Sequence, residues 1–295
     1  MSSRLLLVDG HAYAYRSFHA IRSLSAPDGS PTNAIYGFIK MLQKMIGTLR
    51  PSHLLVIWDG GLAEERMALL PEYKAQRPST PDGLVTQLPQ IEEWLRAAGH
   101  PQWMKEGTEA DDWIGTYARR AEAAGWSVVI ASSDKDFMQL VNERVGILNP
   151  NDKSEKIWSA DDVVAKTGVT PSQVVDWLAL VGDSVDNIPG VPGVGPKTAT
   201  DLLKRFGSIA DLYGRLAEIK SESQRSALTA STEVVQRNQK MVALQCGLTD
   251  GPALEGLVPG TPRVEDLREM YRRWNFRSLL AELGDPTVPQ QGSLW

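Results

Sequence analysis

Residues 182–199 read GDSVDNIPGVPGVGPKTA, and this stretch decides how the second half of the chain folds. Gly193 and Gly195 flank a single valine, so the backbone can make a tight hairpin there. Pro196 follows at once and suits the first position of a helix. Because backbone N–H groups at a helix start can hold a phosphate, the stretch predicts a hairpin that grips a phosphate-bearing ligand.

Two carboxylates precede this hairpin. Asp183 and Asp186 are three residues apart and can share a hard cation. Lys197, at the start of the expected helix, can add a positive charge. A metal ion beside a gripped phosphodiester backbone indicates an enzyme that works on nucleic acid. For the hairpin taken alone, an ordinary glycine–proline loop between two helices remains the alternative.

Three short apolar runs in the first half of the chain end in acidic residues. Residues 5–8 precede Asp9, residues 54–58 precede Asp59, and residues 128–131 precede Asp134 and Asp136. Continuous apolar strands of this length predict a parallel sheet covered on both faces. Apolar residues at helical spacing between the runs predict the covering helices: Ile35, Phe38, Ile39, Leu42, Ile46 and Leu49 in one, and Trp113, Tyr117 and Ala121 in another. The pattern indicates an α/β domain with ligands at the carboxyl ends of its strands.

Strand signals fade after about residue 160. Ser159 and Thr170 suit N-cap positions, and helices are expected near 171–181, 196–206, 208–217, 233–245 and 264–282. We therefore predict an α/β domain over residues 1–165, an all-helical domain over 166–284 and a tail over 285–295.

Nine carboxylates are candidate metal ligands. They follow the predicted strands, open the helix after Thr108 or precede the hairpin: Asp9, Asp59, Glu109, Asp111, Asp112, Asp134, Asp136, Asp183 and Asp186. Oxygen-only ligands favour Mg²⁺ or Mn²⁺ over zinc, and two such ions about 4 Å apart can hydrolyse a phosphodiester. Nine acids gathered without metal would repel one another. The alternative is that each acid caps a helix or lies in a solvated loop.

Composition excludes some classes of protein. The net charge of −5 argues against nucleic-acid binding, but without the nine candidate ligands 31 basic residues face 27 of the 36 acidic ones, a balance of +4. No apolar run is long enough to span a membrane. The single cysteine, Cys246, cannot form an internal disulfide, which suits a reducing, cytoplasmic location.

A basic segment follows the second predicted strand. Lys74 and Arg77 are three residues apart and could face one phosphate. Arg16, seven residues after Asp9, is a weaker phosphate candidate. A solvated charged surface remains the alternative for this segment.

These pieces together resemble the 5′-nuclease, or flap endonuclease, family, and more narrowly the bacterial 5′–3′ exonuclease at the N-terminus of DNA polymerase I. The matching segments, in family order, are VDGH at 8–11, PTNAIYGF at 31–38, EYKAQRP at 72–78, EADD at 109–112, SDKD at 133–136 and residues 182–199. Tyr13, Trp58 and Gln76 depart mildly from the family pattern, and none of these changes removes a candidate ligand.

The resemblance implies a fold and an activity. The fold would be a PIN-like or resolvase-like sheet with a helical arch near residues 62–90, followed by a helix–hairpin–helix domain. The activity would be metal-dependent cleavage of branched or 5′-ended duplex DNA, at 5′ flaps and free 5′ ends, in primer removal and repair. The resemblance also implies a monomer associated with the nucleoid, with a K⁺ ion often bound at the helix–hairpin–helix.

It also assigns roles to residues. Asp9, Asp59, Glu109, Asp111, Asp134 and Asp136 would hold or support the catalytic metals, and Asp112, Asp183 and Asp186 would complete the second site. Lys74 and Arg77 would stabilise charge on the scissile phosphate, and Tyr73 would stack on the terminal base. The DNA backbone would be held by Arg16, Gly190, Gly193, Gly195 and Lys197.

The last residues resemble a docking peptide. Gln291, Leu294 and Trp295 match the Gln-x-Ser/Asp-Leu-aromatic pattern that bacterial proteins present to the sliding clamp. Whether the chain is a free-standing nuclease or a polymerase fragment stays open at this point.

Three other functions are alternatives: a catalytically silent binder of branched DNA, a phosphatase for a small phosphate, and an RNA-cleaving nuclease. The presence of all nine acids disfavours the silent binder. The hairpin and the basic segment have no use in a small-phosphate phosphatase, and the hairpin favours DNA over RNA.

Overall fold

The structure is a computed structural model that describes residues 3–284, and the chain folds into two units built from interleaved segments. The larger unit contains Asp59–Pro78 and Met104–Asp250, and the smaller unit contains Ser3–Trp58, Ser79–Trp103 and residues 251–284. Each unit is built from several stretches of the chain, so the units do not correspond one to one with the predicted domains. The predicted domain boundaries stay a prediction. Gln291, Leu294 and Trp295, the predicted clamp-binding residues, lie outside the described residues.

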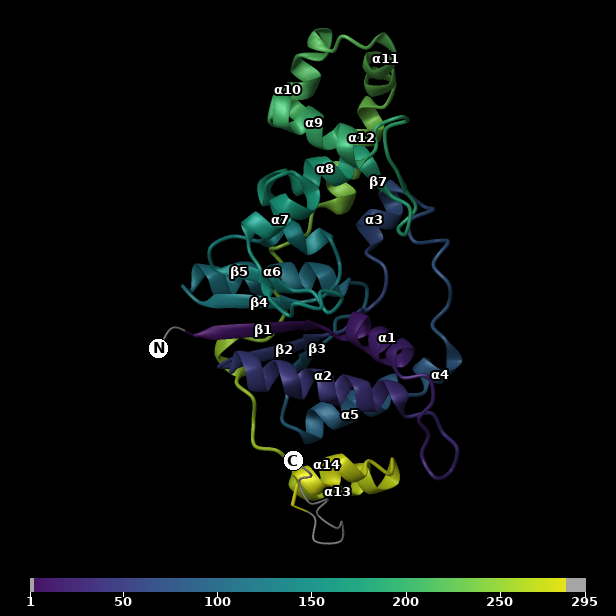
Figure 1. Cartoon of the computed structure of the whole chain (residues 1–295), viewed down its shortest axis with the longest axis vertical. Helices are drawn as coiled ribbons and strands as arrows, with labels where there is room; N and C mark the ends of the chain where they lie inside the picture. The colour runs from purple at the N-terminus through teal and green to yellow at the C-terminus, as the bar shows by residue number, and fades with distance from the viewer. Residues whose placement is uncertain (1–2, 285–295) are drawn as a thin grey trace. The chain divides into compact units, whose positions relative to one another are not determined.

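The smaller unit holds three parallel strands in the order β3 (Gln102–Trp103), β2 (His53–Ile57) and β1 (Arg4–Asp9). Three helices accompany them, α1 (Gly10–Ala20), α2 (Asn33–Leu49) and α5 (Leu88–Ala97) (Figure 1). The apolar runs over 5–8 and 54–57 are almost completely buried, which explains why they lack polar alternation. The first two predicted strands and the helix predicted from residues 35–49 are confirmed.

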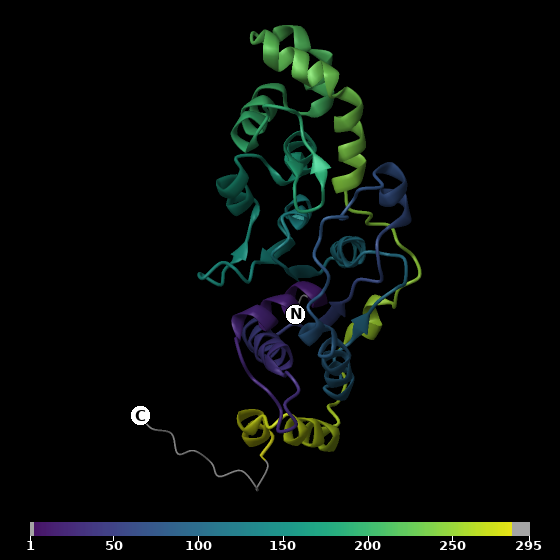
Figure 2. The ribbon, with the colours of Figure 1, turned by 90° about the vertical axis from the view of Figure 1, so that its right-hand side faces the viewer.

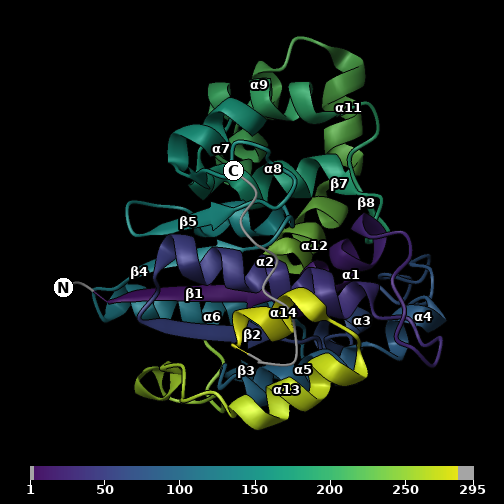
Figure 3. The same cartoon turned by 60° about the horizontal axis from the view of Figure 1, so that its bottom comes forward.

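The end of the described chain packs against α5 in the same unit. Figure 3 shows α13 (Val264–Arg273) beside it, followed by α14 (Arg277–Glu282), and Trp94 Nε1 donates a hydrogen bond to Tyr271 Oη at 2.9 Å. The prediction of one helix over 264–282 was wrong. Asn275 takes the left-handed conformation, with φ of 56°, and divides the segment into two helices.

His100 is the buried titratable group of the smaller unit with the clearest consequence for stability. Its Nδ1 atom is buried and has no hydrogen-bond partner among the described residues, and its ring lies edge-on to Trp94. Burial lowers the pKa of His100 to about 4. Since the folded state resists protonation that the unfolded chain accepts near pH 6.5, stability is lost as pH falls below 6.5.

We predict that His100 accounts for about 2 kcal/mol of unfolding free energy lost between pH 7.5 and pH 5. Urea unfolding at both pH values should show this loss in the unmodified protein and not in His100→Leu. His19→Leu, which removes an exposed histidine, is the matched control and should behave as the unmodified protein. An equal pH dependence in all three proteins would contradict the prediction.

The larger unit contributes strands in the order β4 (Ser127–Ala131), β5 (Val145–Leu148) and β6 (Ile157–Trp158). The first pair is parallel and the second is antiparallel. α6 (Ala110–Ala123) packs against β4 and buries Trp113 and Tyr117, as their spacing predicted. The predicted α/β fold with a mostly parallel sheet is confirmed, and β5, β6 and the two-residue β3 were not predicted.

Helices follow the strands in this unit: α7 (Ala160–Thr167), α8 (Val174–Val181), α9 (Pro196–Phe206), α10 (Ile209–Gly214), α11 (Glu222–Ala230) and α12 (Thr232–Val242). α8 packs against α9 and α12, and Figure 2 shows the later helices of this group in green. The predicted helical region is confirmed, although α11 was not predicted. None of the helices over residues 3–284 is long and apolar enough to cross a membrane.

Two short helices lie where the arch was expected, α3 (Glu64–Leu69) and α4 (Asp82–Val85). α3 belongs to the larger unit and α4 to the smaller unit. The arch near residues 62–90 therefore stays a prediction.

Candidate active site

The larger unit contains eight of the nine candidate ligands, and Asp9 belongs to the smaller unit. Asp9 ends β1 and is the N-cap of α1, where its Oδ1 accepts a hydrogen bond from the Ala12 amide at 2.9 Å. Helix capping, which was the alternative interpretation for any single acid, is therefore a real role of Asp9 in this structure.

Three acids meet at the start of α6. Glu109 is the N-cap residue of this helix, and Asp111 and Asp112 lie in its first turn. Asp59, two residues after the end of β2, accepts a hydrogen bond from the Ala110 amide at 2.8 Å through its Oδ1. The helix N-terminus favours negative charge, which explains how these carboxylates can be concentrated there.

Glu109 is 2% exposed and holds the predicted catalytic lysine. Its Oε2 accepts hydrogen bonds from Lys74 Nζ at 2.8 Å and from Tyr73 Oη at 3.1 Å. Burial works against the charge of Glu109, but Lys74 and Arg66 lower the pKa of the carboxyl below its ordinary value. Burial likewise opposes the charge of Lys74, and Glu109 raises the pKa of the amine. The pair is therefore charged on both sides.

Asp186 joins the basic segment to the stretch before the hairpin. Arg77 donates to Asp186 Oδ1 from Nε at 3.1 Å and from Nη2 at 2.5 Å. The Lys74 amide donates to the Asp186 carbonyl oxygen at 3.0 Å, and Lys74 takes a left-handed conformation with φ of 56°. The two predicted catalytic cations thus lie beside two predicted metal ligands.

Asp134 and Asp136 lie after β4, at the start of the short 3₁₀ helix η1 (Asp136–Leu140). The Asp136 amide donates to Asp134 Oδ1 at 2.8 Å. Burial, followed by the charge of Asp134, raises the pKa of Asp136 well above its ordinary value. Burial and the charges of Asp186 and Asp183 raise the pKa of Asp134. Asp183 and Asp186 are therefore close enough to Asp134 and Asp136 to repel them.

The chemistry of these donors fits a divalent ion. Oxygen ligands suit Mg²⁺ or Mn²⁺, and a cation would relieve the repulsion that raises the pKa of Asp134 and Asp136. Over residues 3–284, no group of three His, Cys, Asp or Glu side chains is already arranged to hold a metal ion. Several of the carboxylates instead contact cationic side chains, as Asp183 does with Lys135 at 3.1 Å.

Arg66 is a site residue that the sequence analysis missed. It lies in α3, is 5% exposed and contacts both Asp112 and Glu109. Arginine in a short charged helix gives no signal of burial, and its partners lie far along the chain, so only the structure places it here.

Two turns lie between α8 and α9, and the second is at the predicted hairpin around Gly193, where the Val194 amide donates to the Val191 carbonyl oxygen at 3.0 Å. β7 (Gly182–Asp183) and β8 (Ile188–Pro189) pair as antiparallel strands, and Gly195 is the N-cap of α9. Gly193 has φ of 77°, which disfavours any side chain. At Gly195 an added Cβ would meet no described atom within 4 Å, and Lys197 is exposed. The backbone around Gly195 is therefore open to a ligand.

These two glycines give a contrasting prediction. Gly195→Ala should leave the unfolding free energy unchanged within about 0.5 kcal/mol, because its backbone is not left-handed, yet weaken binding of duplex DNA about tenfold by crowding a phosphate. Gly193→Ala should cost about 1 kcal/mol of stability through backbone strain. Chemical denaturation and fluorescence anisotropy measure the two effects. Unchanged DNA affinity in Gly195→Ala would remove the phosphate role of this position.

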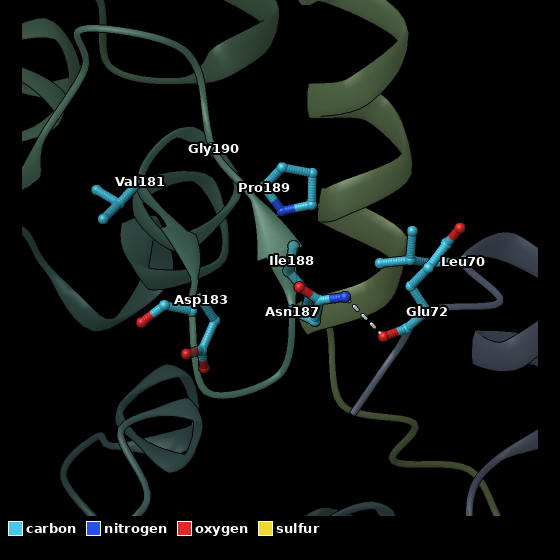
Figure 4. A pocket seen from close by; sticks show the side chains of 9 residues that line it. Leu70, Glu72, Val181, Asp183, Asn187, Ile188, Pro189 and Gly190 are labelled. Carbon is cyan, nitrogen blue, oxygen red and sulfur yellow. Dashed lines mark hydrogen bonds between the residues drawn. The ribbon is translucent and has the colours of Figure 1, made fainter. Parts of the chain in front are cut away.

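A pocket of about 420 Å³ lies beside Asp183 (Figure 4). In Figure 4, Asp183 lies on one side, and Leu70 and Glu72 lie on the other. Asn187 Nδ2 donates to the Glu72 carbonyl oxygen at 2.9 Å. This bond ties the segment before the hairpin to the chain that leads into Lys74.

The structure does not test three of the predicted DNA contacts, those of Tyr73, Arg16 and Gly190. Tyr73 is 4% exposed, so its ring would have to move before it could stack on a terminal base. Arg16 lies in α1 of the smaller unit and is partly buried. Both roles stay predictions, and so does the role of Gly190, which follows β8.

Family models cover most of the chain. A model described as the N-terminal resolvase-like domain of 5′-3′ exonuclease matches residues 4–168, and one described as the C-terminal SAM fold of 5′-3′ exonuclease matches residues 169–263. The curated 5′-3′ exonuclease of Aquifex aeolicus (strain VF5) is 39% identical over 95% of this chain and 94% of its own length. DNA polymerase I of Bacillus caldotenax is 36% identical over 100% of this chain and 34% of its own length. The chain thus spans about a third of that polymerase.

Solved structures are similar in fold. A T5 5′-exonuclease with bound divalent zinc ions has a TM-score of 0.68 and 25% identity, covering 82% of this chain and 90% of its own. The catalytic core of Rad2 in complex with a DNA substrate has a TM-score of 0.63 and 16% identity, covering 96% of this chain and 93% of its own. The predictions of fold class, family and enzyme class are confirmed by these comparisons.

Proposed function

Because the chain belongs to the 5′–3′ exonuclease family, we propose that it is a structure-specific, metal-dependent nuclease that hydrolyses DNA at 5′ flaps and free 5′ ends. One observation carries this proposal. Asp183 and Asp186 act electrostatically on Asp134 and Asp136, and Asp186 is held by Arg77 at 2.5 Å.

The residues of the larger unit that would hold two Mg²⁺ or Mn²⁺ ions are Asp59, Glu109, Asp111, Asp134, Asp136, Asp183 and Asp186. The metal role of Asp9 stays a prediction. When bound, the ions supply a more acidic water and neutralise charge on the leaving oxygen. The divalent zinc ions in the T5 5′-exonuclease support the proposal of a metal-dependent site.

The protein's own cations would act on the phosphate. Lys74 and Arg77 are charged, and Glu109 and Asp186 hold them in place. Positive groups fixed before the reaction stabilise developing negative charge without reorganisation in the transition state. Tyr73 restrains Glu109 through its hydroxyl, so it supports the position of Lys74 indirectly.

The hairpin would hold the duplex. Backbone N–H groups around Gly195 and the charge of Lys197 suit a phosphate backbone and read no base sequence. The DNA substrate in the Rad2 complex supports a DNA ligand for this fold. The proposal also includes a K⁺ ion at the hairpin and docking of residues 291–295 on the sliding clamp. It further includes a monomeric state, a nucleoid location and a role in primer removal and repair.

One assay tests the proposal against its rivals. A labelled 5′-flap DNA is incubated with Mg²⁺ or with EDTA, alongside a single-stranded RNA and a small phosphate ester. We expect Mg²⁺-dependent cleavage of the flap near its junction. Faster hydrolysis of the RNA or of the ester would assign the site to a different substrate, and binding of the flap without cleavage would make the protein a silent binder.

A further inference from the structure

Arg66 joins three helices through one buried guanidinium. Its Nη1 and Nη2 donate to the two oxygens of Asp112, each at 2.8 Å, and Nη1 lies 3.3 Å from Glu109 Oε2. Its Nε donates to the Met241 carbonyl oxygen at 3.0 Å, and Nη2 donates to the Ala243 carbonyl oxygen at 3.3 Å. Arg66 in α3 is thereby bonded to the start of α6 and to the end of α12.

Asp112 is poorly placed to bind a metal ion. It is 3% exposed, and Oδ1 accepts a further hydrogen bond from the Gln245 amide at 2.9 Å. Three of the roughly four acceptor positions of the carboxylate are therefore filled. A divalent ion on either oxygen would also lie beside the positive guanidinium, which repels it.

α12 extends the connection to the hairpin. Asn238, which is fully buried, donates from Nδ2 to the carbonyl oxygens of Ala179 at 3.0 Å and Pro189 at 2.7 Å. Ala179 is in α8 and Pro189 is in β8, on either side of the segment that carries Asp183 and Asp186. The positive guanidinium of Arg66 lies at the C-terminal carbonyl groups of α12, where the helix dipole favours positive charge.

We propose that Arg66 and Asp112 are a positioning pair, which sets the spacing between the acids of α6 and the acids before the hairpin, and that Asp112 makes no bond to metal. This inference rests on the proposed metal-dependent function. It gives Asp112 a different role from the one that the family resemblance implies.

The test measures Mn²⁺ binding without DNA, from the electron paramagnetic resonance of free Mn²⁺. Asp112→Asn and Arg66→Met should each weaken binding about tenfold, the usual cost of losing a group that orients ligands. The double variant should be no weaker than either single one, because the two residues act as a unit. Asp111→Asn, which removes an expected ligand, should weaken binding more than about 100-fold and is the comparator.

A metal-binding role for Asp112 predicts the opposite change in Mn²⁺ affinity for Arg66→Met. If Asp112 were a ligand and Arg66 only competed for it, Arg66→Met would tighten Mn²⁺ binding and Asp112→Asn would weaken it as much as Asp111→Asn; either result would overturn the inference. Arg66→Lys keeps the charge but not the paired hydrogen bonds. We expect it to stay weakened, and full affinity in Arg66→Lys would also overturn the positioning role.

Folding is monitored by thermal unfolding of each variant. If Arg66→Met does not fold, Arg66→Met/Asp112→Leu, which removes both charges together, replaces it. The experiments distinguish failure of the proposed nuclease function from failure of the inference about Arg66 and Asp112. An unmodified protein that neither binds Mn²⁺ nor cleaves a flap refutes the proposed function and this inference, whereas tightened binding in Arg66→Met with normal flap cleavage by the unmodified protein refutes the inference alone.

Discussion

Replacing Asp134 with alanine is expected to slow flap cleavage by about 100- to 1000-fold, while DNA affinity stays within about threefold. Asp134 is repelled by Asp183 and Asp186 and itself repels Asp136, so it is a strong candidate to hold a cation. The hairpin that would hold the duplex does not depend on this side chain. The loss should therefore appear in the single-turnover rate and not in the dissociation constant.

Two variants check the interpretation of this result. Asp134→Asn keeps an acceptor for the Asp136 amide and should be as slow as the alanine variant, because the charge is lost in both. Asp161→Ala removes an exposed carboxylate from the start of α7 in the same unit and should cleave at the normal rate. Full activity in Asp134→Ala would remove this residue from the catalytic machinery.

Lys74→Met is expected to lower the single-turnover rate by about 100-fold, with a smaller loss of stability of about 1–3 kcal/mol. Methionine keeps most of the length of the side chain but removes the charge that would act on the scissile phosphate. Stability falls because Glu109 loses a hydrogen bond of 2.8 Å, although Arg66 still lies 3.3 Å away. Rapid-quench kinetics and thermal unfolding measure the two effects separately.

Lys166→Met is the matched control for charge. Lys166 is exposed in α7, so this variant changes the net charge equally and should cleave flaps as the unmodified protein does. If Lys74→Met and Lys166→Met cleave at the same rate, Lys74 has no special role at the phosphate.

The acids at strand ends were predictable because local sequence determines them. A buried apolar run ends where a charged residue stops it, and Asp9, Asp59 and Asp134 each follow such a run. The hairpin was predictable for the same reason, since Gly193 needs the positive φ that the structure shows. Family resemblance then supplied the roles, and the comparisons confirm the family itself.

The ion pairs within the site could not be predicted, because they join residues distant in the chain. Arg66 is 46 residues from Asp112 and 175 from Met241, and no local pattern links them. Lys74 is likewise buried and pairs with Glu109, 35 residues away, although the residues next to it in the sequence suggest an exposed basic segment. The break at Asn275 was missed because the apolar spacing continues across it.

The packing of α13 and of Trp274 on α5 limits how far the protein can be shortened. Trp94, Tyr271, Trp274 and Phe276 are each at most 2% exposed in the smaller unit. Aromatic side chains bury roughly 150–250 Å² each, so a version that stops at residue 263, where the second family model ends, would expose Trp94 to water. Excision at that point should yield an insoluble product, and a soluble version must keep Tyr271, Trp274 and Phe276.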